Sequence, residues 1–181
     1  MVERTRAELA LREQELMRSH RLLDAIAEIQ SLFIRDAEPR RVFDSMLDTL
    51  LRVTDSAYGF VGELLHEADG TPSLRTLALT NIAWDDASRA LYTRHAQGEG
   101  MRFRNLDSLF GVSLRTGEAV ISNTPASDPR SGGTLTGHPA MDAYMGLPVH
   151  AGGRMVGLIG LANRRGGYDE ALLAHLQPLV R

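Results

Sequence analysis

The N-terminal part of the chain has a hydrophobic pattern that repeats every seven positions. The segment from Val2 to about Ile34 contains no glycine or proline. One seam of the repeat is apolar throughout: Val2, Leu9, Leu16 and Leu23. The second seam is polar at first and apolar later: Thr5, Arg12 and Ser19, then Ile26 and Phe33. The pattern predicts a long helix with coiled-coil character, whose pairing should be weak at the N-terminus and firmer from Leu22 onward.

Two interpretations of this helix remain open. It either pairs with a second copy of the chain, or it packs only on its own domain. We favour pairing because residues 1–19 precede any plausible domain core, so that their leucines would otherwise face water. The sequence therefore predicts a parallel dimer through four residues: Leu9, Leu16, Leu23 and Ile26.

A second helix follows a break in the pattern at residues 36–39. Pro39 is tolerated in the first turn of a helix, and the acidic residues before it suit the helix dipole. An apolar stripe at three- and four-residue spacing then continues to Val53: Val42, Phe43, Met46, Leu47, Leu50 and Leu51. This spacing predicts an amphipathic helix with one buried side.

Short apolar segments separated by turn residues predict the start of a sheet after the second helix. Strands are expected over Ala57–Leu65 and Leu74–Ile82, with a turn at residues 67–72. Three short elements are expected next: a helix from Trp84 to about Ala96, a helix over Leu106–Arg115 ended by Gly117, and a strand over Ala119–Ser122.

Two strands near the C-terminus, Met141–His150 and Arg154–Asn163, are apolar on both alternating faces. A strand of this kind is covered on both sides. The residues between them, Ala151-Gly152-Gly153, tolerate positive φ and predict an antiparallel hairpin at the centre of the sheet. One face of this hairpin should meet helices, and the other can form the wall of a cavity.

The final apolar segment predicts a helix that starts near Tyr168 and continues to Arg181. Its leucines lie on one side: Leu172, Leu173, Leu176 and Leu179. Because the pattern is still helical at Arg181, we expect this helix to continue into a longer protein whose C-terminal part holds an output activity.

The composition fits one globular domain with an appendage. The chain has 181 residues, 43% of them hydrophobic and 24% charged, with a formal charge of −3. Its apolar runs are too short for a membrane span, and no signal peptide starts the chain, so a cytoplasmic location is expected. The absence of cysteine excludes disulfides, thiolate nucleophiles and Cys-liganded zinc. The charge balance gives no electrostatic footprint for nucleic acid.

Several segments together resemble a GAF domain. They are Tyr144–Val149, Met155–Asn163 and Gly167–Glu170, which are similar to the last two GAF strands and the start of the following helix. The resemblance implies an α+β fold of layered α/β/α type, with a central antiparallel sheet, terminal helices on one face, and short helices and loops over a ligand pocket. It also implies a division into a signalling helix, residues 1–36, and a GAF domain, residues 37–181.

The resemblance does not identify a cofactor. GAF domains that bind cyclic nucleotides carry an Asn-Lys, Phe, Asp-Glu signature, to which Asn163-Arg164, Tyr168 and Asp169-Glu170 are only loosely similar. Phytochrome-type GAF domains attach bilin to a cysteine, which is missing here. A haem could use a histidine, but no paired ligand pattern selects one. We therefore expect no cofactor, and an unidentified small molecule as effector.

A polar loop from Asn123 to Pro139 resembles the pocket loop of GAF domains in bacterial sensor histidine kinases and diguanylate cyclases. Arg130 could bind a carboxylate or phosphate, or pair with Asp128 within the loop. His138 either donates to a ligand or hydrogen-bonds its own loop. Asn123 contacts a ligand or anchors the loop backbone. Ser131, next to Arg130, completes this group of candidate ligand-binding residues.

Four further residues are candidates for the wall of the pocket. Asn81 and Trp84 lie between the second strand and the next helix, where they could supply an amide contact and an aromatic wall. Phe110 and Tyr144 could close the cavity, although each residue suits a plain core equally well. No catalytic residue or metal ligand is assigned, because the chain has no Gly-x-Ser-x-Gly elbow and no paired histidine motif.

These observations predict a sensory module without catalysis, dimerised through its N-terminal helix and regulating a C-terminal output domain. The resemblance favours a histidine kinase, with a diguanylate cyclase or phosphodiesterase as the alternative. The expected partners are a second copy of the chain and a small molecule, with an anion as one option, but neither nucleic acid nor membrane. Two rivals are a ligandless dimerisation module and an enzyme related to free methionine sulfoxide reductase, whose dependence on cysteine argues against it.

Overall fold

A computed structural model describes residues 2–35, 38–81, 86, 89, 92–93, 100–132 and 138–180 of the chain. Its helices are α1 (Val2–Arg35), α2 (Pro39–Thr54), α4 (Leu109–Thr116) and α5 (Glu170–Leu176), followed by the 3-10 turn η1 (Gln177–Leu179). Its strands are β1 (Tyr58–His66), β2 (Pro72–Leu79), β3 (Arg102–Phe103), β4 (Val120–Ser122), β5 (Tyr144–Ala151) and β6 (Arg154–Ala162).

The strands form one antiparallel sheet of six strands in the order β3-β2-β1-β6-β5-β4. The hairpin of β5 and β6 lies inside this sheet, as its two-sided apolar pattern predicted. The hairpin turn consists of Gly152 and Gly153, whose φ angles of 57° and 76° are the values that a two-residue turn of this kind requires.

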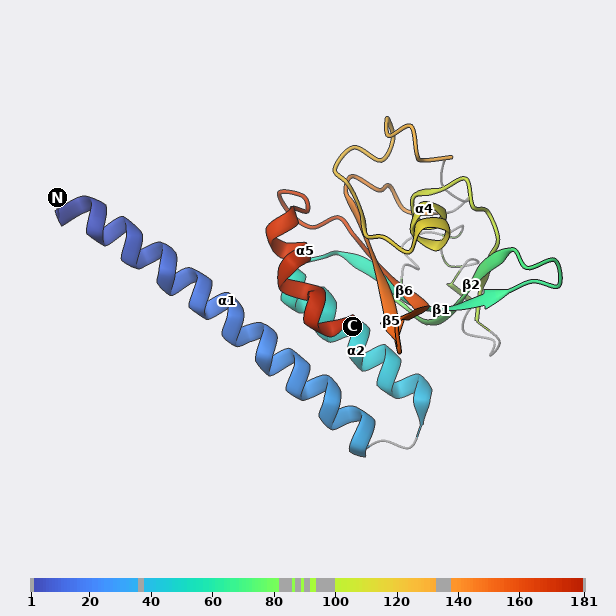
Figure 1. The fold of residues 1–181 in the computed structure, drawn as a ribbon, viewed down its shortest axis with the longest axis horizontal. Helices are drawn as coiled ribbons and strands as arrows, with labels where there is room; N and C mark the ends of the chain where they lie inside the picture. The colour runs from blue at the N-terminus through green and yellow to red at the C-terminus, as the bar shows by residue number, and fades with distance from the viewer. Residues whose placement is uncertain are drawn as a thin grey trace.

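Helices α1, α2 and α5 lie on one side of the sheet, and α4 lies on the other (Figure 1). Met145, Leu147, Ile159 and Leu161 from the central hairpin point into the helical side and are at most 2% exposed. They pack with Leu47 and Leu50 of α2 and with Leu176 of α5: a single apolar cluster thus joins the sheet to the terminal helices. The predicted α+β architecture, with terminal helices on one face and a long helix ahead of them, is confirmed.

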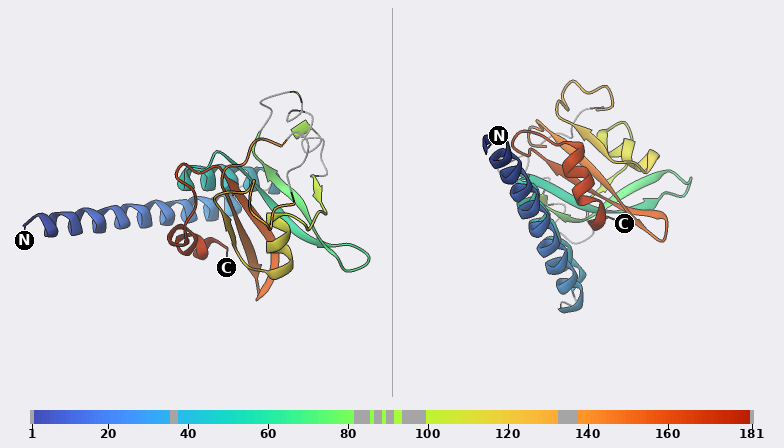
Figure 2. Two further views of the ribbon diagram at one scale, coloured as in Figure 1. Left: turned by 90° about the horizontal axis from the view of Figure 1, so that it is seen from above. Right: turned by 60° about the vertical axis from the view of Figure 1, so that its left-hand side comes forward.

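Helix α1 projects far beyond the rest of the molecule at its N-terminal end (Figures 1 and 2). Its later half packs on the domain, because Leu22, Ala25 and Ile29 are buried against the core. Leu23 is 59% exposed while its neighbour Leu22 is 5% exposed, so two different sides of the helix are apolar. Both interpretations of the helix therefore retain a structural basis, one for each side.

The C-terminal helix is shorter than the sequence pattern predicted, and that expectation was wrong. Helix α5 ends at Leu176, and the chain continues as the turn Gln177–Leu179. Pro178 has no N–H to continue the α-helical hydrogen bonds, and the chain tightens into a 3-10 turn in which Pro178 lies in the first positions. The chain then returns to the sheet, where the His150 N–H donates to the Val180 carbonyl oxygen at 2.8 Å.

Two other differences concern the middle of the chain. Strand β3 was not predicted, because two residues are too few to show a period. The expected helix from Trp84 to Ala96 falls largely outside the described residues, and so does Trp84 itself. Among the helices that are described, none combines the length and the apolar character needed to cross a membrane.

Candidate functional site

The face of the sheet that α4 covers has two glycines at its centre. The strand register places four residues in one row across β4, β5, β6 and β1: Ser122, Tyr144, Ala162 and Tyr58. The next row consists of Val120, Gly146, Gly160 and Phe60. Cross-strand partners share a face, so two adjacent glycines leave the middle of this face without side chains.

Aromatic side chains occupy the space above these glycines. The ring of Phe60 lies where a side chain at position 160 would start. At position 146, a Cβ atom would be 2.8 Å from the Tyr144 hydroxyl oxygen and 3.0 Å from Ser113 Oγ of α4. A ligand on this face would therefore have to displace or share space with Phe60 and Tyr144.

Tyr144 has the chemistry of a ligand contact, although it lies in the core. It is 5% exposed, Ser113 is fully buried, and neither hydroxyl has a hydrogen-bond partner within the described part of the chain. Burial raises the pKa of Tyr144, so its hydroxyl stays protonated and can both donate and accept. An unsatisfied buried hydroxyl costs about 1–3 kcal/mol, which a polar ligand group could recover.

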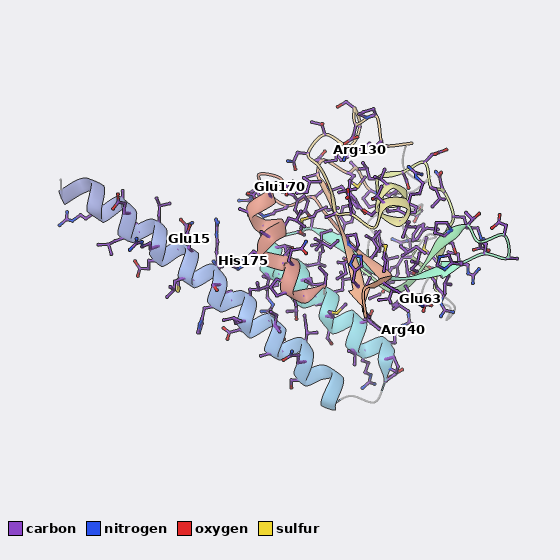
Figure 3. The ribbon with its side chains drawn as sticks, in the orientation of Figure 1. Glu15, Arg40, Glu63, Arg130, Glu170 and His175 are labelled. Atoms are coloured by element: carbon purple, nitrogen blue, oxygen red, sulfur yellow. The ribbon has the colours of Figure 1, made fainter. Side chains whose placement is uncertain are left out.

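The loop after β4 is organised by an ion pair between Arg130 and Asp128. Nε of Arg130 donates to Oδ1 of Asp128 at 2.9 Å, and Nη2 donates to Oδ2 at 2.7 Å. The same Nη2 also donates to the carbonyl oxygen of Ile121 at 2.8 Å. The pairing with Asp128 considered at the sequence level is thus present. No described residue bonds Nη1 of Arg130, whose side chain is 43% exposed, so this nitrogen is available to a ligand. Figure 3 shows Arg130 in this loop, on the side of the molecule away from α1.

The hydrogen bonds from Arg130 hold the pKa of Asp128 far below its usual range. A carboxylate with a lowered folded-state pKa stabilises the fold at neutral pH, and this contribution disappears as the pH falls below about 4. We expect Asp128→Asn to lower the free energy of unfolding at pH 7, with the difference from wild type shrinking on acidification. Urea unfolding at several pH values measures this difference, and a constant difference would contradict the prediction.

Asn123 connects the loop to the helical side of the molecule. Its Oδ1 accepts from the Tyr168 N–H at 2.8 Å, and its Nδ2 donates to the Tyr168 carbonyl oxygen at 2.9 Å. The Tyr168 hydroxyl, whose pKa burial raises to about 12, then bonds Ser56 Oγ at 2.8 Å. Ser56 bonds Thr54, whose hydroxyl donates to the Leu50 carbonyl oxygen of α2. Asn123 therefore anchors the backbone of Tyr168, whereas the sequence suggested that it would anchor the backbone of its own loop or contact a ligand.

Asn163 makes a similar connection one strand away, and the sequence reasoning did not assign it a site role. Its side chain accepts from the Asp142 N–H at 2.7 Å and donates to the Ala140 carbonyl oxygen at 2.8 Å. Its φ of 56° is unusual for a residue other than glycine but tolerated by asparagine. The sequence signal that could have identified Asn163 is its position directly after an apolar strand.

His138 lies beside this connection and makes mainly structural contacts. Its Nδ1 is 2.8 Å from the Pro139 carbonyl oxygen, and its ring meets Tyr58 edge-on at a centroid distance of 5.7 Å. Tyr58 donates to the Ala140 carbonyl oxygen at 3.2 Å, and burial raises its pKa. Tyr58 was another residue that the sequence reasoning missed.

The remaining predicted residues do not gather at one point. Ser131 follows Arg130 and donates its N–H to the Asp128 carbonyl oxygen. Phe110 packs on Phe103 with ring centroids 5.6 Å apart, on the α4 side of the sheet. Asn81 lies exposed beyond the end of β2. In the described ranges, no group of three histidine, aspartate or glutamate side chains could hold a metal ion.

Comparison with known proteins agrees with this architecture. The sequence model of the GAF domain family matches residues 36–181. A search of curated proteins finds no significant match.

Solved structures of the same fold are similar over most of their length. The GAF domain of a phosphoenolpyruvate-protein phosphotransferase from Coxiella burnetii has a TM-score of 0.68 at 11% identity, covering 90% of this chain and 89% of that one. The A. aeolicus nlh2 GAF domain in an inactive state has a TM-score of 0.63 at 12% identity, covering 91% and 93%. A free methionine-R-sulfoxide reductase from Neisseria meningitidis with its substrate has a TM-score of 0.62 at 11% identity, covering 88% and 83%. At these identities the likeness concerns the fold alone.

Proposed function

Because the chain belongs to the GAF domain family, we propose that it is a cytoplasmic sensory module of a bacterial signal-transduction protein. It binds a small molecule and relays its presence to an output domain. A sensor histidine kinase is the favoured output, and a diguanylate cyclase or phosphodiesterase is the alternative. The proposal rests on described residues that connect the polar loop after β4, where a ligand could bind, to the terminal helices.

The observation that carries this function is the pair of hydrogen bonds between Asn123 and Tyr168. Asn123 starts the polar loop, and Tyr168 lies two residues before α5. A change of loop conformation must either move the start of α5 or break these bonds. The loop and the helical layer are thus mechanically joined, as a relay requires, and a ligand with different affinities for two loop states would shift their populations.

Strand β5 provides a second connection in the same direction. Tyr144, at its beginning, lies on the face beneath α4, and His150, near its end, holds the Val180 carbonyl oxygen. A shift of this strand is therefore passed on to the segment after α5. Both connections support a relay from the sheet and loop toward the terminal segments.

Dimerisation is the second part of the proposal, and the exposed side of α1 supports it. Leu9, Leu16 and Leu23 are 60%, 75% and 59% exposed at seven-residue spacing. Ile26, expected to take part in the dimer from the second seam of the repeat, packs partly against the domain's own core. We therefore place the seam on the three leucines, with Ile26 at its edge.

Two alternatives differ in mechanism. A ligandless dimerisation module is favoured by the rings of Phe60 and Tyr144, which fill the gap above Gly160 and Gly146. An enzyme of the free methionine sulfoxide reductase type is disfavoured, because that chemistry depends on cysteines and the chain has none. We propose no catalysis for this chain.

Native mass spectrometry of the protein purified from cells tests the proposal directly. We expect a dimer with a retained small molecule that is lost on denaturation. If the ligand carries an anionic group near Arg130, Arg130→Ala should lose about 1.5–3 kcal/mol of binding, or roughly tenfold or more in affinity.

The same experiment separates the alternatives. A dimer without any retained molecule, and without stabilisation in a thermal-shift screen of metabolites, would favour the ligandless module. Equal retention by wild type and Arg130→Ala would show that this arginine acts only through its pair with Asp128.

A further inference from the structure

A polar hollow of about 420 Å³ lies where β4 and β6 end and β5 begins, beside the start of α5. It is lined by Asn123, Asp142, Ala143, Asn163, Arg164, Arg165, Gly166 and Gly167. Ala143 belongs to the core on the helical side, whereas the next residue, Tyr144, packs beneath α4. The hollow is therefore separate from the sheet face described above, and its volume is within the range of small-molecule sites.

The walls of the hollow are held by side-chain clamps. Asn123 binds both backbone groups of Tyr168, and Asn163 binds the backbone of residues 140–143. Gly167 lies so close to Asn123 that a Cβ atom there would be 2.6 Å from the Asn123 Oδ1 atom. The hollow is thus preorganised, which reduces the entropic cost of binding.

Two neighbouring arginines give the hollow its positive charge. Arg164 is fixed by hydrogen bonds from Nε to the Thr54 carbonyl oxygen at 3.1 Å and from Nη1 to the Gly167 carbonyl oxygen at 2.6 Å. No described residue bonds its Nη2. Arg165 is exposed and forms neither an ion pair nor a hydrogen bond with any described residue. An unpaired guanidinium beside a fixed one is suited to a planar anionic group.

The backbone between these residues adds donors. The Gly167 N–H bonds the Arg164 carbonyl oxygen at 3.0 Å and closes a turn, in which Gly166 has a φ of 80°. The N–H groups of Arg165 and Gly166, in the middle of this turn, take no part in its closing bond. Successive amides in such a turn form concavities that bind anions.

We propose that this hollow binds the phosphate or carboxylate group of a small molecule through Arg165 and the free edge of Arg164. The occupant contacts Asn123 and Gly167, which connect the loop to α5, and Arg164, which holds the end of α2. The site is therefore placed to act as an effector site for the terminal helices. Binding here does not depend on whether the face beneath α4 takes a ligand.

Titration of the whole chain with inorganic phosphate at constant ionic strength, followed by the amide NMR signals of Gly166 and Gly167, tests the proposal. We expect saturable shifts in the wild type. Arg165→Ala should weaken phosphate binding about tenfold or more, because it removes a charge-assisted hydrogen bond. Asp142→Asn should strengthen it, since Asp142 is an anion lining the same hollow. A parallel titration with succinate distinguishes carboxylate from phosphate preference.

Arg154→Ala is the matched control, because Arg154 is an exposed arginine next to the β5–β6 turn, away from the hollow. It should leave phosphate binding unchanged. Shifts that never saturate with either anion would overturn the proposal. Unchanged binding in Arg165→Ala, or an equal loss in Arg154→Ala, would do so as well, since the effect would then be general charge attraction.

Discussion

Replacing Leu16 and Leu23 together by lysine should convert the protein from a dimer to a monomer. Both side chains are largely exposed on α1, and Leu16, at 75%, is the most exposed large apolar residue of the described chain. Burying a leucine stabilises the buried state by about 1.5–3 kcal/mol, and in a symmetric dimer the same leucine is buried in both copies. Lysine removes this gain and places like charges opposite each other. Light scattering at micromolar concentration measures the change.

Leu11→Lys provides the control for this experiment. Leu11 is 61% exposed on the same projecting half of α1 but lies outside the seven-residue repeat of Leu9, Leu16 and Leu23. It should leave the dimer intact. A wild type that is already monomeric at micromolar concentration would contradict the dimer proposal. If Leu11→Lys dissociated the dimer equally, the contact could not be assigned to Leu9, Leu16 and Leu23.

The sequence predicted those parts of the fold in which a local period reports burial. The hairpin of β5 and β6 is apolar on both faces because α1, α2 and α5 cover one side of the sheet and α4 covers the other. Its pattern alone therefore placed it inside the sheet. The C-terminal end of α4 followed from Gly117, whose φ is 71°, whereas the helix begins at Leu109 after the capping Ser108 and not at Leu106 as expected. The start of α2 followed from Pro39 in the same way.

Where the prediction failed, a competing local rule was overlooked. The leucines of the last helix continue the helical period past Leu176, but Pro178 ends the helix before the period does. In α1, a seven-residue repeat identified one apolar side, whereas Leu22, Ala25 and Ile29 form another that packs on the domain. A repeat identifies an apolar side of a helix and leaves open what covers it.

The candidate site was less predictable because its contacts join residues far apart in sequence. Arg130 and Asp128 are two residues apart, so their pairing was one of two interpretations available from the sequence. Asn123 and Tyr168 are 45 positions apart, and no local pattern connects them. Asn163 reaches back 23 positions to Ala140, and only the register of the sheet brings these together.

Asn123→Ala should weaken both the fold and the connection between the loop and α5. It removes two hydrogen bonds, of 2.9 and 2.8 Å, to the backbone of Tyr168. At about 0.5–1.5 kcal/mol each, their loss should lower the free energy of unfolding by about 1–3 kcal/mol. Chemical denaturation measures this effect. Hydrogen exchange at the Tyr168 amide should accelerate more than exchange in β5 and β6, because the opening is local.

Two further variants distinguish the loss of the Asn123 hydrogen bonds from the effect of any substitution in this part of the loop. Asn123→Asp keeps the acceptor for the Tyr168 N–H but turns a carboxylate toward the Tyr168 carbonyl oxygen, so it should fall between wild type and Asn123→Ala. Thr124→Ala changes the next, exposed residue and should stay within about 0.5 kcal/mol of wild type. If Asn123→Ala instead kept wild-type stability and a protected Tyr168 amide, the loop would not be joined to α5 through this side chain. Strand β5 would then be the next candidate for a relay, because His150 donates to the Val180 carbonyl oxygen and so connects the sheet to the segment after α5.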